Sequence, residues 1–199
     1  MKKFKLITTI MLLLFALSAP ASAISLQIGL AYCNSNLYME NSESMTSDLD
    51  ARLGVAVAAS FPISPLMEIQ AGLTYYTAAS SKDMEDLIGD KQSIGLMPIE
   101  IAAKFSIPGL GMTGMNPYAG VGINYTTWTP DPAFDSAFAK DLTAGLGYYA
   151  FVGASFGNLF AELGYTWMRG SLKVLMPSEE DVNLESRGVY LKGGMLLGI

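Results

Sequence analysis

The sequence predicts an all-β fold, an eight-stranded antiparallel up-and-down β-barrel that spans a membrane as strands. Three observations predict it. Hydrophobic residues make up 51% of the 199 residues and charged residues only 15%, a composition that excludes a disordered chain. Apolar and polar residues alternate with a period of two along most of residues 24–199, as they do in strands with two different faces. Long charged connections alternate with short turns, a pattern typical of barrels that cross a membrane.

Residues 1–23 have the composition of an export signal. Three lysines near the start precede an apolar run over residues 6–17, and the small-residue motif Ala21-Ser22-Ala23 follows. This order predicts a Sec signal peptide cleaved after Ala23, and leaves a barrel domain at 24–199. The alternative is a membrane anchor, but the apolar run is shorter than the ~20 residues that a spanning helix needs.

Eight alternating segments are expected to form the strands. Residues 142–156 show the pattern most fully, because one face is wholly apolar or aromatic and the other is mainly small and polar. Pro98 lacks a backbone donor and predicts a bulge or kink in its strand. Gly157-Asn158 predicts a two-residue hairpin turn. In chain order the expected strands are residues 26–33, 51–61, 66–77, 93–105, 117–128, 142–156, 159–168 and 188–199.

The connections differ between the two ends of the predicted barrel. Those at 34–50, 78–92, 129–141 and 169–187 are long and charged, whereas the turns at 62–65, 106–116 and 157–158 carry no charge. A soluble domain would spread its charges over most exposed faces. A soluble lipocalin-like carrier would also need polar outward faces, so the sequence favours the membrane barrel. Of the 18 acidic residues, 15 lie in or beside the long loops: Glu40, Glu43, Asp48, Asp50, Asp83, Glu85, Asp86, Asp90, Asp131, Asp135, Asp141, Glu179, Glu180, Asp181 and Glu185.

Six charged residues fall within strands, always on the polar face. A charge that faces lipid at the midplane costs about 2–4 kcal/mol for Arg or Lys, so these side chains are expected to face the lumen and pair with one another. We call the predicted set the lumen charge network and expect most of it in the half of the barrel near the short turns. Its members are Arg52, Glu68, Glu100, Lys104, Glu162 and Lys192.

Glycines and aromatic residues also follow the alternation. Inward glycines either make room for Tyr118, Trp128, Tyr149 and Phe151 or allow the strands to curve, and the sequence leaves both readings open. Outward aromatic residues are expected in two girdles at the membrane interfaces. The girdle near the short turns would contain Phe61, Phe105, Phe156 and Phe160, and the one near the long loops Tyr32, Tyr75, Tyr125 and Trp167.

The composition excludes several kinds of chemistry. The chain has no histidine, which excludes a Ser-His-Asp triad and a histidine zinc site, and its formal charge of -6 argues against nucleic-acid binding. Glu68, Glu100 and Glu162 could imitate a glycosidase pair, but a filled lumen gives a sugar no access. The loop acids are better explained as a solvated surface than as a calcium site. We expect no catalytic residue, cofactor or metal, and no enzyme activity.

Two stretches resemble a known family. Residues 95–105, centred on Pro98, are similar to the fourth strand of small outer-membrane barrels, and the sequence NPYAGVGINYT at 116–126 is similar to the fifth. The chain thereby resembles the OmpW family, within the wider group of OmpA-like and porin-superfamily barrels. The resemblance implies an integral outer-membrane protein, and OmpW-like barrels are associated with the passage of small hydrophobic molecules through a narrow lumen. This chain ends in Gly198-Ile199, where such barrels usually end in an aromatic residue.

The expected function is a structural or narrow-channel role in the cell outer membrane. Outer-membrane lipid, the barrel assembly machinery and a small hydrophobic ligand are the expected partners, and the sequence sets no oligomeric state. The alternative is a surface adhesion or binding protein that acts through the four acidic loops.

Overall fold

The fold is a single antiparallel sheet. The computed structural model describes residues 24–40, 45–48, 51–80, 93–108, 114–130, 139–174 and 180–198. The predicted signal peptide and most of the acidic loop residues lie outside these ranges. No helix in the described ranges is long and apolar enough to cross a membrane. The strands are β1 (Ser25–Glu40), β2 (Met45–Asp48), β3 (Arg52–Ser64), β4 (Met67–Ser80), β5 (Ser93–Ser106), β6 (Met115–Pro130), β7 (Ala139–Phe156), β8 (Leu159–Val174) and β9 (Glu180–Gly198).

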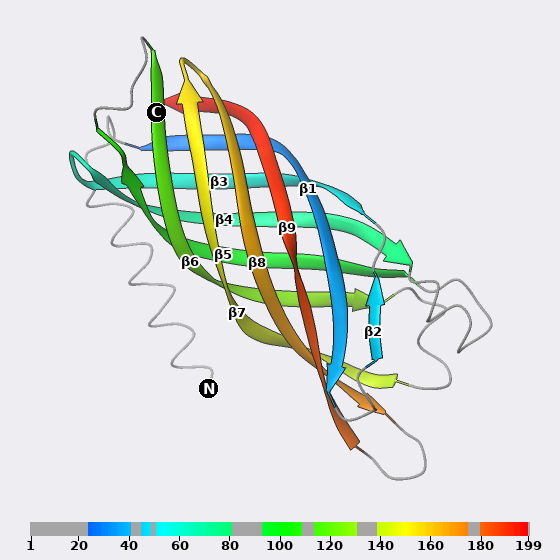
Figure 1. Cartoon of the computed structure of the whole chain (residues 1–199). Helices are drawn as coiled ribbons and strands as arrows, with labels where there is room; N and C mark the ends of the chain where they lie inside the picture. The colour runs from blue at the N-terminus through cyan, green and yellow to red at the C-terminus, as the bar shows by residue number, and fades with distance from the viewer. Residues whose placement is uncertain are drawn as a thin grey trace.

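Pairing of the first strand with the last closes the sheet. β1 pairs with β3 along one edge and with β9 along the other, from Ser25↔Gly198 to Glu40↔Asn183. Figure 1 shows the two strands side by side in blue and red. β2 is a short addition that pairs with the outer part of β1 beyond the end of β3. The wall therefore contains eight strands, β1 and β3 to β9, and the predicted eight-stranded antiparallel barrel is confirmed.

The strands are longer than the alternation predicted, mainly toward the long loops. β1 continues to Glu40, β8 continues to Val174, and β9 begins at Glu180. Periodicity missed these extensions because their outward register, which is apolar in the rest of the wall, carries mostly polar and charged residues. A tilted membrane strand needs about 9–11 residues, whereas β9 has 19. The surplus residues therefore extend the wall beyond the apolar belt at the long-loop end.

Two local features of the ladder follow from single residues. The register of β4 with β5 shifts between Tyr76 and Ala79, close to Pro98, which has no donor for the ladder. The predicted irregularity is therefore present, displaced toward the long loops. Gly157 has a φ of 55° in the tight turn between Phe156 and Leu159, a conformation that glycine adopts at little cost.

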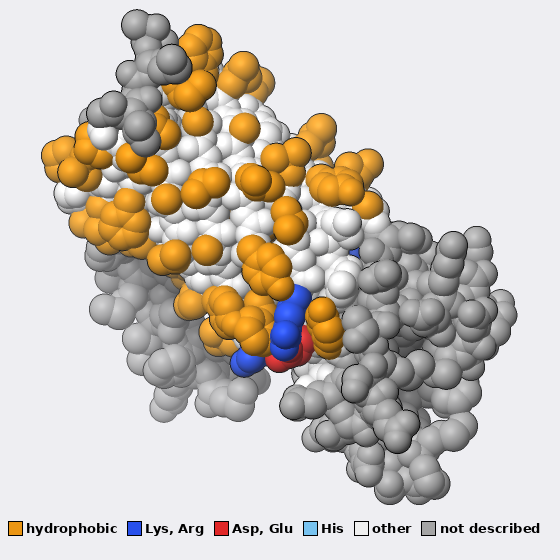
Figure 2. All heavy atoms as spheres, in the orientation of Figure 1, with side chains coloured by type: hydrophobic (Ala, Val, Ile, Leu, Met, Phe, Trp, Pro, Cys, Tyr) orange, Lys and Arg blue, Asp and Glu red, His pale blue; other side chains and the backbone are white. Residues whose placement is uncertain are grey.

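Alternation gives the wall an apolar outer surface. Leu30, Leu53 and Leu146 are 71%, 65% and 60% exposed, while their chain neighbours Ala31 and Arg52 are buried. Figure 2 shows hydrophobic side chains spread over the face of the barrel in view. A water-soluble protein rarely exposes so large a continuous apolar surface. This surface is suited to contact with lipid. A soluble carrier would have a polar exterior instead.

Inward glycines make room for aromatic rings. A Cβ atom on Gly120 would lie 2.3 Å from the Phe151 ring, and one on Gly153 would lie 2.6 Å from the Tyr118 ring. The same relation, at 2.5 Å, holds between Gly164 and Tyr190. The structure thus favours the interpretation that these glycines make room for aromatic rings over the interpretation that they allow the strands to curve. The rings occupy the space that the missing side chains leave.

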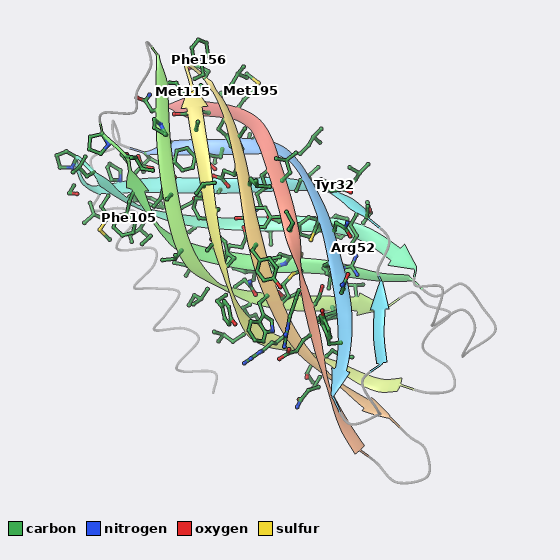
Figure 3. All side chains as sticks on the ribbon, viewed as in Figure 1. Tyr32, Arg52, Phe105, Met115, Phe156 and Met195 are labelled. Atoms are coloured by element: carbon green, nitrogen blue, oxygen red, sulfur yellow. The ribbon has the colours of Figure 1, made fainter. Side chains whose placement is uncertain are left out.

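The expected girdles are present with one correction. Phe105 and Phe156 point outward near the short turns, whereas Tyr32 lies closer to the long loops (Figure 3). Phe160, which was expected in the same girdle as Phe156, is instead 6% exposed and lines the lumen. The tight turn before it places Leu159 on the outer face, 57% exposed, so the next residue points inward.

Substitution of one inward glycine should test this packing. Gly153→Ala places a methyl group against both the Tyr118 ring and the Ala161 carbonyl, and overpacking of this kind costs about 1–3 kcal/mol. We expect a lower temperature for loss of the compact band on unheated gels. Gly193→Ala is the matched control, because its nearest contact would be an ordinary 3.6 Å, and its stability should change by less than about 0.5 kcal/mol. Equal effects of the two variants would contradict the packing account.

Candidate functional site

The structure places all six members of the predicted lumen charge network on the inner face of the wall. Arg52, Glu100, Lys104, Glu162 and Lys192 are buried, and the side chain of Glu68 is 30% exposed. Five of the six lie in the half of the barrel near the short turns. Arg52 lies apart from them at the long-loop end of β3, as Figure 3 shows.

One part of the network links β4, β5, β6 and β8. Glu68 and Lys104 are partners across β4 and β5, and their side chains form an ion pair of 3.1 Å. The Lys104 ammonium lies 4.2 Å from the centre of the Tyr118 ring, a favourable cation–π geometry. Tyr118 in turn donates a hydrogen bond of 3.1 Å to Glu162. These contacts bring together charges from strands that are far apart in the sequence.

A second part joins β9 to β5 across the lumen. Lys192 donates to Glu100 at 2.5 Å, and Glu100 also accepts a bond of 3.3 Å from the Thr74 hydroxyl. Lys192 is also the register partner of Glu162 on β8. Buried charges are tolerated when they are paired and hydrogen-bonded. The Glu100–Lys192 pair therefore ties together strands that are not neighbours in the sheet.

Arg52 has a different environment from the other five. It is 1% exposed, and none of its three guanidinium nitrogens has a hydrogen-bond partner. Its register partner on β1 is Cys33, a buried free cysteine. The structure therefore brings Arg52 into the lumen without joining it to any acid among the residues that it describes. Alternation along β3 predicts the face that the side chain occupies, but it gives no information on its height relative to the acids of other strands.

Rings fill the middle of the lumen. Tyr149 stacks on Phe151 at 5.8 Å and meets Tyr190 edge-on at 6.4 Å. Leu96, Met168 and Leu184 are fully or almost fully buried closer to the long loops. A cavity bordered by Gln70, Thr74, Glu100, Phe160 and Lys192 measures only about 10 Å³, close to the minimum that a single water needs. Side chains therefore fill the lumen at this level of the described barrel.

Sequence reasoning missed several polar residues of this site. Gln70 donates to Gln27 at 2.7 Å, and Asn124 donates to the Thr166 hydroxyl at 3.3 Å. All four are uncharged residues on the inward register, so the same alternation that identified the charged residues could have identified them. Among the residues described, no group of acidic and cysteine side chains is arranged to hold a metal ion.

The comparisons with known proteins agree with this architecture. No family model matches the sequence, and none of the curated proteins is similar to it. The attachment invasion locus protein Ail of Yersinia pestis, in complex with the heparin analogue sucrose octasulfate, has a TM-score of 0.51 and 11% identity over 88% of this chain and 99% of Ail. The outer membrane protein AlkL in lipid bilayers has a TM-score of 0.50 and 13% identity over 85% of this chain and 88% of AlkL.

These similarities define the class of fold. Identities this low show the fold alone, and that fold is the small eight-stranded barrel of outer-membrane proteins. The apolar exterior and the filled, polar interior described above are what such a barrel requires.

Removal of one partner of the Glu100–Lys192 pair should destabilise the barrel more than removal of both. Lys192→Met leaves the Glu100 carboxylate buried beside the Thr74 hydroxyl alone, and breaking a buried pair in this way costs roughly 3–5 kcal/mol. The double variant Lys192→Met, Glu100→Gln should recover most of that loss. Urea unfolding in lipid vesicles measures the free energy of unfolding of the wild type, of the single variants Lys192→Met and Glu100→Gln, and of the double variant. Additive effects of the two substitutions would show that the pair is not coupled.

Proposed function

We propose that this protein is an integral outer-membrane barrel with a structural or narrow-channel role, whose lumen is closed at rest by the network around Glu100 and Lys192. The observation that carries the proposal is the filled interior, where rings and ion pairs leave a cavity of only about 10 Å³. A barrel of eight strands is just wide enough for side chains to fill it. In the narrow-channel form of the role, a small hydrophobic molecule passes only when these side chains move.

The apolar belt supports the proposed location. Outward side chains in the middle of the wall are mainly hydrophobic on every strand, and aromatic residues lie near both ends. On this proposal residues 1–23 direct export, the barrel assembly machinery inserts the chain, and the longer loops face the outside. The proposal contains no catalytic step, because a closed lumen without histidine has no access for a substrate and no imidazole base.

Loop-mediated adhesion stays a prediction from the sequence. It depends on acidic residues that mostly lie outside the described ranges, and no contact described in the barrel favours it over the closed-lumen proposal.

Fractionation tests the proposed location. We expect the protein in the outer-membrane fraction, released by detergent and not by osmotic shock. The unheated sample should migrate faster on a gel than the heated one, because the hydrogen-bonded barrel stays compact in detergent. A soluble protein whose migration does not change on heating would overturn the proposal.

Conductance measurements test the closed lumen. In planar bilayers the wild-type protein should show no steady open water pore. The triple variant Tyr118→Ala, Tyr149→Ala, Tyr190→Ala removes three rings from the lumen and should produce steady conductance steps. Alanine at Tyr75, Tyr125 and Tyr165 is the matched control, because these three tyrosines are about half exposed on the outer wall, and this variant should remain closed. A large steady conductance in the wild type would contradict the proposal.

A further inference from the structure

A cluster of charged and aromatic side chains breaks the apolar outer surface near the long loops. Arg169 on β8 and Glu185 and Arg187 on β9 belong to the outward register of their strands. Figure 2 shows blue and red side chains together at one place on the barrel face. Among the side chains that the structure describes, these are the charged ones on the outer wall. Such a position is costly in hydrocarbon but favourable where lipid headgroups begin.

Aromatic rings hold the two guanidinium groups in place. Arg187 lies 4.0 Å from the centre of a Trp167 ring and 4.9 Å from Tyr38. Arg169 lies 4.8 Å from the same Trp167 ring, which meets Tyr148 at 4.7 Å. The cluster thus covers four adjacent strands, β7, β8, β9 and β1. Tyrosine and tryptophan are the residues that membrane proteins place at the lipid–water interface, so the cluster has the composition expected at the height of the lipid headgroups.

The cluster has a net positive charge, because one carboxylate faces two guanidinium groups. Glu185 is shared between the two arginines, with one oxygen 3.1 Å from Arg169 Nε and the other bonded to Arg187. Each guanidinium carries more N–H donors than a shared carboxylate can accept from. The side chains of Arg169 and Arg187 remain 49% and 36% exposed. One positive charge and several donors therefore face outward, in the fork geometry that phosphate accepts.

A hollow of about 460 Å³ is lined by Arg169 and Glu185, and Arg187 lies beside it as the second partner of Glu185. The β7–β8 ladder shifts register between Ala144 and Tyr148, next to Arg169. Side chains of the outward register on three neighbouring strands line the hollow, and its lining is mainly polar. They are Thr143, Leu146, Arg169, Ser171, Asn183 and Glu185. The volume lies within the range of ordinary small-ligand sites, about 300–1,000 Å³.

We propose that this hollow binds the phosphate-bearing sugar headgroup of an outer-leaflet glycolipid. Arg169 and Arg187 would hold the phosphate, and the Ser171 and Asn183 side chains would meet sugar hydroxyls. The hydrophobic wall directly below, which includes Leu146, would take the acyl chains. A lipid fits better than a soluble anion because the charged end and the apolar surface are continuous. The inference rests on the proposed outer-membrane location for its biological setting, but the binding itself is measurable on the purified barrel.

Native mass spectrometry of the folded, full-length mature protein in detergent tests the proposal. The probes are bis-phosphorylated lipid A and the same lipid after removal of both phosphates. The wild type should retain the phosphorylated form at least about tenfold better, since hydrogen bonds to a charged group contribute roughly a decade of affinity or more. The variant Arg169→Gln, Arg187→Gln should lose this preference. Glu185→Gln should keep or increase it, because the competing carboxylate is gone.

The matched control is Lys82→Gln, Lys91→Gln, which removes the same charge from the connection between β4 and β5 and should leave the preference unchanged. Equal retention of both lipids by the wild type, or an unchanged preference in the double arginine variant, would overturn the proposal. Displacement of the lipid by inorganic phosphate at equal concentration would reassign the site to a soluble anion. Heat-dependent migration of each variant shows whether it is folded. A folded protein in the outer membrane without the lipid preference would sink this inference alone.

Discussion

Closure of the sheet between β1 and β9 is the constraint on which the other features depend. In lipid every backbone N–H and C=O group needs an internal partner, and pairing from Ser25 to Glu40 removes the free edges that an open sheet would present. Closure also separates the lipid outside the barrel from the confined interior, whereas a flat sheet encloses no interior. Alternate side chains of each strand then face lipid and the confined interior. A residue's position in the alternation therefore determines whether an apolar or a polar side chain is favoured there.

The narrowness of an eight-stranded barrel explains the composition of its interior. Too little space remains for a large residue at every inward position, so glycines such as Gly120 and Gly153 face the rings of Phe151 and Tyr118. The small width of the interior also brings charged residues close together. Glu100 and Lys192 come from opposite parts of the sequence, yet they meet at 2.5 Å because the wall curves around them. A buried pair of this kind adds little stability compared with a well-packed apolar replacement, although loss of one partner alone is costly.

The two ends of the barrel meet different surroundings. Near the short turns the outer wall carries Phe105, Met115 and Phe156, without a charge among the described outward side chains there. Near the long loops the strands continue past the apolar belt, and Arg169 and Arg187 appear on the outer wall beside Trp167. The cost of placing a charge near lipid falls toward the interface. That gradient accounts for a hydrocarbon-facing wall that is neutral and an outer rim that is charged.

The sequence by itself determined the strand number, the positions of most strands, the direction of most side chains and the difference between the two sets of loops. These depend on a period of two and on local turn chemistry, which are written in neighbouring residues. Only the tertiary structure decided which inward residues meet. Alternation put Arg52 and Glu100 on the same face, but their heights follow from the stagger between strands, which no single strand encodes. For that reason Lys192 pairs with Glu100, whereas Arg52 meets no acid among the residues that the structure describes.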